Sequence, residues 1–281
     1  MKVAALQMVS STRLDTNLDR AHALLTEAAR AGAELAVLPE YFCLMGQHDT
    51  DKLAIQEPLG AGRIQQFLAE RARELKLWIV GGTLPLSLPT HQLPDQGQSD
   101  RQRVTNTSLV YSPQGACVAR YDKIHLFRYD DGRERFDETR VLQAGQQAVR
   151  FELPSRDGHR WRVGLSICYD LRFPELYRAH AQAGADLLLV PSAFTFTTGQ
   201  AHWDVLLRAR AVENLAFVLA AAQGGVHENG RQTWGHSMTI DPWGRVLASQ
   251  VQGEGLVLSE FHAELLTLCR QQLPALKHRV L

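Results

Sequence analysis

The feature that most constrains this chain is an alternation of short apolar runs with longer amphipathic stretches. Val3–Met8 is predicted to form a strand. Leu14–Ala31 follows as a helix, because its apolar side chains recur every three or four residues and Gly32 can end it. The alternation continues in a strand, a helix and a further strand, at Leu35–Leu38, Ile64–Leu75 and Leu77–Val80. Strands that alternate with helices predict an α/β fold.

The next part of the chain contains a predicted hairpin, after which the alternation resumes. Gly81-Gly82 end the third strand, and Leu86–Gln102, which is rich in Pro, Gln, Asp and Ser, is predicted to be a surface loop. Thr105–Tyr111 and Ala116–Tyr121 are expected to pair around a turn at Ser112–Gly115. Beyond a polar stretch, strands are predicted at Trp161–Ile167, Leu187–Val190 and Phe217–Ala222, helices at Glu175–Ala183 and His202–Glu213, and a strand pair at Ser237–Ile240 and Arg245–Ala248.

No Gly/Ser-rich linker or abrupt change in composition divides the 281 residues, so we expect one domain with two similar halves. Thirty basic residues balance thirty acidic ones, so the overall charge favours neither nucleic acid nor an anionic membrane as a partner. The longest apolar runs, Leu187–Val190 and Leu215–Ala222, are too short to span a bilayer. Met1-Lys2 leads directly into the first predicted strand and leaves no room for a signal peptide.

The four cysteines, at positions 43, 117, 168 and 269, are widely separated. None belongs to a CxxC pair or to a Cys/His cluster with metal-site spacing, so no metal site is predicted. A disulfide framework is not expected in a chain of this length, and we predict a reducing, cytoplasmic location.

Cys168 differs from the other cysteines in its position. It follows an apolar strand, and Pro174 shortly after it can begin a helix. A thiol on such a strand-to-helix turn has backbone N–H groups nearby that can stabilise negative charge, as a nucleophile requires. The alternative is a buried cysteine that only packs at the end of its strand, which is the commoner role for a single cysteine.

Two charged residues also follow predicted strands. Glu40 lies just beyond Leu35–Leu38, and Lys123 lies just beyond Ala116–Tyr121. Groups at strand ends in α/β sheets converge on one edge, where ligand sites are usually built, although each residue alone is more often solvent-exposed. A carboxylate can accept the thiol proton, and an ammonium can stabilise a thiolate or an oxyanion. Glu40, Lys123 and Cys168 therefore suffice for acyl transfer without a metal or an organic cofactor.

These three segments resemble the signatures of the nitrilase (carbon–nitrogen hydrolase) superfamily, in order and in spacing. Glu40 stands in Leu-Pro-Glu, Lys123 in Tyr-Asp-Lys-Ile-His-Leu-Phe, and Cys168 in Ser-Ile-Cys-Tyr-Asp-Leu-Arg-Phe-Pro-Glu. The resemblance covers essentially the whole chain. It implies a four-layer α-β-β-α sandwich over residues 1–281, with a core of about 1–260, and a homodimer or larger oligomer with the tail 261–281 at the interface. It also implies an amidase that forms a thioester on Cys168, with the Tyr169 backbone N–H at the oxyanion and Glu138 as a second glutamate near Lys123.

Two longer segments resemble one branch of this superfamily, the deaminated glutathione amidases and ω-amidases. They are Thr198–Glu213 and Trp234–Gly244, and Leu206-Leu-Arg, Ala222-Gln and His236-Ser-Met favour the deaminated glutathione side. Two departures are Gly-Gln-Ala-His-Trp in place of Gly-Pro-Ala-His-Trp, and the unusual segment Arg128–Arg135. The implied substrate is deaminated glutathione, cleaved to 2-oxoglutarate and cysteinylglycine. Such an anion needs a cationic anchor, and the candidate substrate-binding residues are Arg172, Arg128, Arg133, Phe194 and Thr195.

Other functions remain open at this stage. The same residues suit an ω-amidase acting on 2-oxoglutaramate, or a nitrilase, and the fold suits a catalytically silent binding scaffold. His125, His202 and His236 are expected to be structural, which disfavours a Cys–His protease. His202-Trp-Asp204 lacks the paired histidines of a helical zinc site, and Gly60-Ala-Gly62 lacks the third glycine of a dinucleotide-binding turn.

Overall fold

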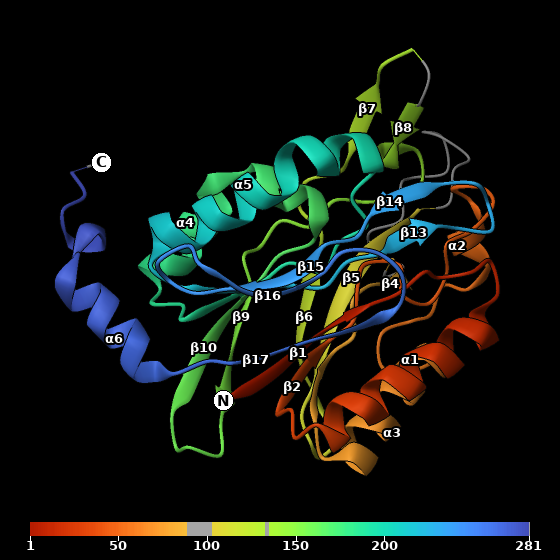
Figure 1. Ribbon diagram of the computed structural model, residues 1–281. Coiled ribbons are helices and arrows are strands. Elements are labelled where there is room, and N and C mark those ends of the chain that lie inside the picture. Colours follow the sequence, from red (N-terminus) through yellow and green to blue (C-terminus); the bar gives the residue numbers. More distant parts are fainter. Residues whose placement is uncertain (89–102, 133–134, 281) are drawn as a thin grey trace.

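The computed structural model describes residues 1–88, 103–132 and 135–280, and shows two stacked β-sheets with helices outside them (Figure 1). Among these residues, the strands of the first sheet are β1 (Lys2–Gln7), β2 (Leu35–Val37), β3 (Trp78–Val80), β4 (Leu84–Ser87), β5 (Val104–Tyr111), β6 (Cys117–Asp122) and β17 (Gly255–Glu260). Their order is β17-β1-β2-β3-β5-β4, with β6 paired to β5. β1, β2 and β3 run parallel to one another.

The second sheet contains β9 (Arg150–Pro154), β10 (Arg160–Leu165), β11 (Leu187–Leu189), β12 (Phe217–Ala220), β15 (Ser237–Ile240) and β16 (Val246–Gln250). Its order is β16-β15-β12-β11-β10-β9, with β10, β11 and β12 parallel. Two small hairpins lie outside the sheets, β7 (Arg128–Asp130) with β8 (Arg135–Asp137) and β13 (Gly224–Val226) with β14 (Gln232–Trp234).

Helices cover the outer face of each sheet. The α-helices are α1 (Leu14–Arg30), α2 (Asp51–Ala54), α3 (Arg63–Leu75), α4 (Pro174–Gln182), α5 (Phe196–Asn214) and α6 (Ala263–Gln272), and the short 3₁₀ helices are η2 (Glu138–Arg140), η3 (Cys168–Arg172) and η4 (Ala275–Lys277). α1 and α3 pack on the first sheet, α4 and α5 lie over the second, and α6 extends from one side of the molecule (Figure 1). The predicted four-layer α-β-β-α sandwich is therefore confirmed.

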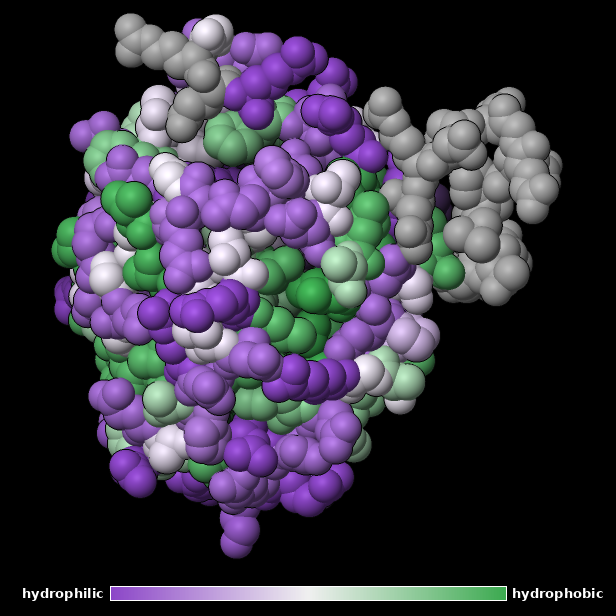
Figure 2. Space-filling view, turned by 90° about the vertical axis from the view of Figure 1, so that its right-hand side faces the viewer, coloured by the Kyte–Doolittle hydropathy of each residue, from purple (hydrophilic) through white to green (hydrophobic). Residues whose placement is uncertain are grey.

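The alternation of side chains along β1 explains how one strand serves two layers. Val3 and Ala5 belong to the core between the two sheets, whereas Ala4 and Leu6 belong to the core beneath α1 and α3. Successive side chains of a strand point to opposite faces, so a strand buried on both faces is apolar throughout. The surface seen in Figure 2 is mostly hydrophilic, with hydrophobic residues gathered near its centre. No helix among the described residues is long and apolar enough to cross a membrane.

The predicted strands and helices are present, with shifts at their ends. The largest shift is in α5, which begins at Phe196 rather than His202 because the Thr195 hydroxyl caps it by accepting a hydrogen bond from the backbone N–H of Thr198. The predicted loop at Leu86–Gln102 is wrong at its start, since Leu86 and Ser87 belong to β4, and its residues 89–102 lie outside the described part. The elements that the sequence reasoning missed are α2, α6, β4, β7, β8, β9, β13, β14 and β17.

Candidate active site

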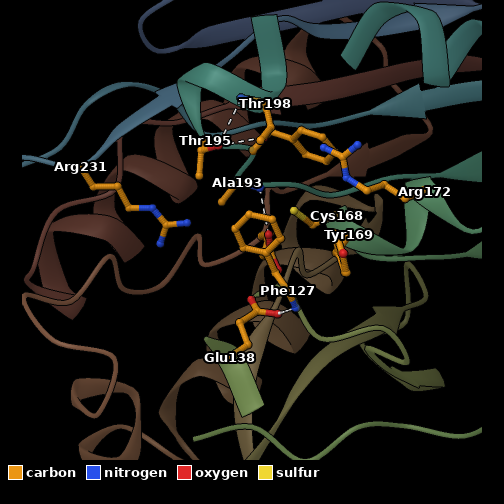
Figure 3. A pocket seen from close by; sticks show the side chains of 11 residues that line it. Phe127, Glu138, Cys168, Tyr169, Arg172, Ala193, Thr195, Thr198 and Arg231 are labelled. Atoms are coloured by element: carbon orange, nitrogen blue, oxygen red, sulfur yellow. Dashed lines mark hydrogen bonds between the residues drawn. The ribbon is translucent and has the colours of Figure 1, made fainter. Parts of the chain in front are cut away.

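Cys168 stands on a sharp turn between β10 and α4. Its φ of 48° is in the left-handed region, which costs a residue other than glycine about 1–3 kcal/mol. The turn is held by a hydrogen bond from the Cys168 backbone N–H to the Pro191 carbonyl at 3.0 Å. The sulfur faces the pocket, with Tyr169 beside it (Figure 3).

Glu40 follows β2 and is almost completely buried. One carboxylate oxygen, Oε1, accepts hydrogen bonds from Lys123 Nζ and Asn106 Nδ2, both at 2.9 Å, and Oε2 accepts one from the Ala193 backbone N–H at 2.9 Å. Gly82 packs directly behind this segment, where a Cβ atom would collide with the Pro39 carbonyl. These contacts fix the carboxylate, because every one of its hydrogen bonds comes from a different segment of the chain.

Lys123 lies between two carboxylates. It follows β6, is 1% exposed, and places Nζ 2.9 Å from Glu40 and 2.9 Å from Glu138. Burial alone would lower its pKa, but the negative charges of Glu138 and Glu40 outweigh burial and raise the pKa above its ordinary value. Lys123 therefore stays an ammonium at neutral pH.

Glu138 begins η2 and holds the far side of the same ammonium. Its Oε1 accepts a hydrogen bond from the Tyr41 hydroxyl at 2.8 Å, and its Oε2 accepts one from the Phe127 backbone N–H at 2.7 Å. Burial would raise its pKa, but the charge of Lys123 and the hydrogen bonds lower the pKa below its ordinary value. Glu138 is thus an ionised, fully hydrogen-bonded partner of Lys123.

The electrostatic surroundings keep the Cys168 thiol protonated. Burial raises its pKa first, the negative charge of Glu40 raises it further, and the positive charge of Lys123 offsets only part of this. The resting group is therefore a thiol rather than a thiolate. A proton acceptor is needed when the sulfur reacts, and Glu40 is the carboxylate that acts most strongly on the thiol, ahead of Glu138.

A buried aspartate joins the segments that carry Lys123 and Cys168. Asp170 accepts hydrogen bonds from the Tyr121 hydroxyl at 2.6 Å, from the Ile167 backbone N–H at 2.9 Å, and from the backbone N–H and ring Nδ1 of His125 at 3.0 and 2.7 Å. Tyr121 and His125 flank Lys123 in the sequence, and Ile167 directly precedes Cys168. The His125 ring stacks on the Phe173 ring with their centroids 3.7 Å apart, so the contacts of His125 are structural.

The pocket is partly open to solvent, and the empty space within it and at its mouth is about 290 Å³. Its lining residues are Glu40, Phe127, Glu138, Cys168, Tyr169, Arg172, Ala193, Phe194, Thr195, Thr198 and Arg231 (Figure 3). Among the described residues, no group of three His, Cys, Asp or Glu side chains is arranged to hold a metal ion.

The structure brings most of the sequence-predicted residues into this pocket. Arg172, Phe194 and Thr195 line it together with the Glu40 and Cys168 cluster. Arg128 is not brought into the described lining, because it lies on the projecting β7 strand with its side chain 70% exposed. Its Nε lies 3.6 Å from Asp137, a contact that holds the hairpin. Arg133 lies outside the described residues.

Sequence reasoning missed several residues around the cluster, namely Tyr41, Asn106, Asp170, Ala193, Thr198 and Arg231. The polar run Thr105–Ser108 inside an apolar strand was a signal for Asn106, since a polar side chain buried in a sheet needs a partner. Arg231 had no such signal, because it lies in a polar turn whose side chains are usually solvated.

A buried thiol, a carboxylate and an ammonium in one pocket of an α-β-β-α sandwich define a class of protein, the hydrolases of nitrilase type. The chain belongs to the carbon–nitrogen hydrolase family, which it matches over residues 2–271. It is 42% identical to the deaminated glutathione amidase of Synechocystis sp., over 99% of this chain and 97% of the relative, and 36% identical to the omega-amidase NIT2 of Mus musculus, over 99% and 94%. Among solved structures it resembles Saccharomyces cerevisiae Nit3, with a TM-score of 0.85 and 29% identity over 100% of this chain and 97% of that one.

Proposed function

We propose that the protein is an amidase that hydrolyses a small, carboxylate-bearing amide with Cys168 as its nucleophile. The observation that carries this proposal is that Cys168 and Glu40 line one pocket, with the buried Lys123 ammonium 2.9 Å from Glu40. The substrate we propose is deaminated glutathione, because the Synechocystis relative is a deaminated glutathione amidase and matches nearly the whole chain. The products are 2-oxoglutarate and cysteinylglycine.

In the first half of the reaction, the Cys168 sulfur attacks the amide carbon while Glu40 accepts the thiol proton. A carbon–sulfur bond forms, and the carbonyl oxygen becomes an oxyanion that the Lys123 ammonium and the Tyr169 backbone N–H stabilise. Tyr169 lies in the first turn of η3, where backbone N–H groups lack intrahelical acceptors. The oxyanion then collapses, the carbon–nitrogen bond breaks, and the amine leaves with the proton from Glu40.

In the second half, water hydrolyses the thioester. Glu40 accepts a proton from water as the water oxygen attacks the acyl carbon, the carbon–sulfur bond breaks, and the sulfur regains a proton from Glu40. One water is consumed and the free carboxylic acid is released. Glu138 keeps the Lys123 ammonium in position throughout, through its 2.9 Å contact.

Replacement of the proposed nucleophile tests this mechanism. Cys168→Ala is expected to lower kcat at least about 1000-fold, because no other group replaces a covalent nucleophile. The assay measures 2-oxoglutarate released from deaminated glutathione, and intact-protein mass spectrometry with a slow substrate is expected to show an acyl adduct in the wild type. Cys117→Ala, which changes an exposed cysteine, is the matched control. Full turnover by Cys168→Ala would overturn the proposal.

A second candidate function is an ω-amidase acting on 2-oxoglutaramate, which the 36% identical mouse relative supports. The ratio of kcat/KM for the two amides distinguishes the candidates, and a higher value on 2-oxoglutaramate assigns the ω-amidase. Turnover of neither amide would favour a nitrile substrate or a binding scaffold.

We further propose a cytoplasmic homodimer in which the segment 261–281 contributes to the interface. Support comes from apolar side chains exposed on or near this segment, including Leu268 and Leu273, and from four cysteines that are all unpaired. Analytical ultracentrifugation of the full chain is expected to give about twice the mass of 31.4 kDa. A monomer at micromolar concentration would contradict the dimer.

A further inference from the structure

Two guanidinium groups enter the pocket from different parts of the chain. Arg172 ends η3, directly after the Cys168 turn, and Arg231 precedes β14 in the β13–β14 hairpin. Figure 3 shows Arg231 on one side of the pocket and Arg172 on the opposite side, with Cys168 between them in that view. A substrate bound at the sulfur would therefore meet one cation at each end.

Arg231 is held in place by apolar contacts rather than by an acid. Its Cζ lies 4.9 Å from the centre of the Phe136 ring, and its Nη1 lies 3.9 Å from the Met45 sulfur. Its Nε is buried and has no hydrogen-bond partner among the described residues, and none of their carboxylates lies within ion-pair distance of its guanidinium. An immobilised guanidinium without an anion is prepared to bind one, because its donors form a fixed planar fork that matches a carboxylate.

Arg172 is similar in that no described carboxylate pairs with it. Its Cζ lies 5.9 Å from the Tyr169 ring centre and 5.6 Å from that of Phe194, and its Nη2 lies 3.2 Å from His202 Nδ1. By contrast, the buried Arg210 has an acidic partner in Glu213 at 2.8 Å. The two arginines of the pocket are thus cationic without a compensating acid at hand.

The position of Arg231 relative to the acids indicates which end of the substrate it meets. Its guanidinium packs on the ring of Phe136, which precedes Glu138 by two residues, and Arg231 and Glu138 both line the pocket, so Arg231 lies on the side of the Glu138–Lys123–Glu40 cluster. The departing amine must receive its proton from that cluster. Arg172 lies on the other side, where the acyl portion remains attached to the sulfur.

We propose that Arg231 binds a carboxylate on the amine portion of the substrate, while Arg172 binds the carboxylate of the acyl portion, so that the pocket selects amides with a carboxylate on each side of the scissile bond. This inference rests on the proposed amidase function. Deaminated glutathione has this character, since its 2-oxo acid lies on the acyl side and its glycine carboxylate on the amine side. 2-Oxoglutaramate has a carboxylate on the acyl side alone and releases ammonia.

The experiment measures kcat/KM of the wild type and of Arg231→Gln on deaminated glutathione, on its C-terminal glycinamide, and on 2-oxoglutaramate. Arg231→Gln is expected to lower the ratio of kcat/KM for deaminated glutathione over 2-oxoglutaramate about 10- to 100-fold, the usual effect of one charged hydrogen-bonded contact, chiefly through KM. The wild type is expected to lose a similar factor on the glycinamide, and the variant is expected to discriminate little between acid and glycinamide.

Arg160→Gln, which removes an equal charge from an exposed side chain, is the matched control and is expected to leave all three values unchanged. An equal loss on all three substrates in Arg231→Gln, with an unchanged melting temperature, would overturn the role on the amine side. An unchanged ratio of kcat/KM for deaminated glutathione over 2-oxoglutaramate in Arg231→Gln would also overturn that role. If the wild type turns over neither amide, the proposed function itself fails, and that outcome is distinct from the others.

Discussion

At the scale of single residues, the site depends on how three buried charges are balanced. Lys123 lies between Glu40 and Glu138, with its Nζ 2.9 Å from each carboxylate, and it carries the positive charge of this cluster. Burial, together with the negative charge of Glu40, raises the pKa of the Cys168 thiol and keeps it protonated. The ammonium therefore compensates two buried carboxylates and, in the proposed mechanism, also stabilises the oxyanion.

Lys123→Met is expected to lower the free energy of unfolding by about 3–5 kcal/mol, because it leaves two carboxylates buried without a counter-charge. It is also expected to abolish turnover. Urea denaturation at pH 7.5 measures the first effect. The double variant Lys123→Met/Glu138→Gln, which removes one of the two charges, is expected to recover part of the stability but no activity. Equal stability of the single variant and the wild type would show that the cluster is more solvated than its burial indicates.

The sequence predicted the reactive residues better than the residues that surround them. Glu40, Lys123 and Cys168 each follow a strand, so their positions at strand ends could be predicted from the sequence, although the strands belong to two different sheets. Ala193 contributes a backbone N–H to Glu40, and Arg231 comes from a turn between two short strands. Neither residue could be recognised from its type or from the hydrophobic period of the sequence. Their places in the site depend on how distant loops pack after the sheets have formed.

At the scale of elements, the turn at η3 is joined to the end of β6 through Asp170. Strands β6 and β10 belong to different sheets, so nothing in the hydrogen bonding of either sheet sets the distance between Lys123 and Cys168. The Asp170 carboxylate, which is fully buried, provides that connection.

Asp170→Asn is expected to lower the free energy of unfolding by about 1–3 kcal/mol, since the amide group faces backbone donors and leaves at least one of them unpaired. It is also expected to lower kcat about 10-fold or more, because the two segments shift relative to each other. Tyr121→Phe removes one donor and is expected to cost about 1 kcal/mol. Thermal melts and steady-state assays measure both. A variant of Asp170 with normal kcat would show that the segments are positioned by packing alone.

At the scale of the whole molecule, the alternation of strands and helices was enough to predict an α/β fold, and the resemblance added the stacked sheets. The sequence pattern predicted the β15–β16 pair, but it did not predict the antiparallel edge strands β9 and β17. β9 shows why, since only Phe151 and Leu153 of its five residues are buried, and such a short alternation also occurs in loops. The site lies where the two sheets meet, so it forms only when both halves are folded.

Two buried histidines make the stability of the whole molecule dependent on pH. His180 lies on the buried face of α4, with its Nε2 2.9 Å from the Leu165 carbonyl oxygen. His227 has its ring nitrogens 2.9 Å from the Ser10 carbonyl oxygen and 2.8 Å from the Thr233 hydroxyl. Burial lowers the pKa of both below 6.5. Arg150 near His180 and Arg231 near His227 act in the same direction, whereas Asp170 opposes the shift of His180.

Because the folded pKa values are lowered, the unfolded chain binds protons near pH 6.5 that the folded protein does not bind. The free energy of unfolding is therefore expected to fall as pH decreases below about 6.5, by up to about 1.4 kcal/mol per pH unit for each histidine, until the folded pKa is passed. Urea denaturation between pH 7.5 and 5 measures this slope. His227→Gln keeps a donor and an acceptor at that position. It is expected to reduce the slope of the unfolding free energy against pH by up to the contribution of one proton, and to change the free energy of unfolding less at pH 7.5. A flat profile in the wild type, or an unchanged slope in the variant, would show that these histidines become protonated without unfolding.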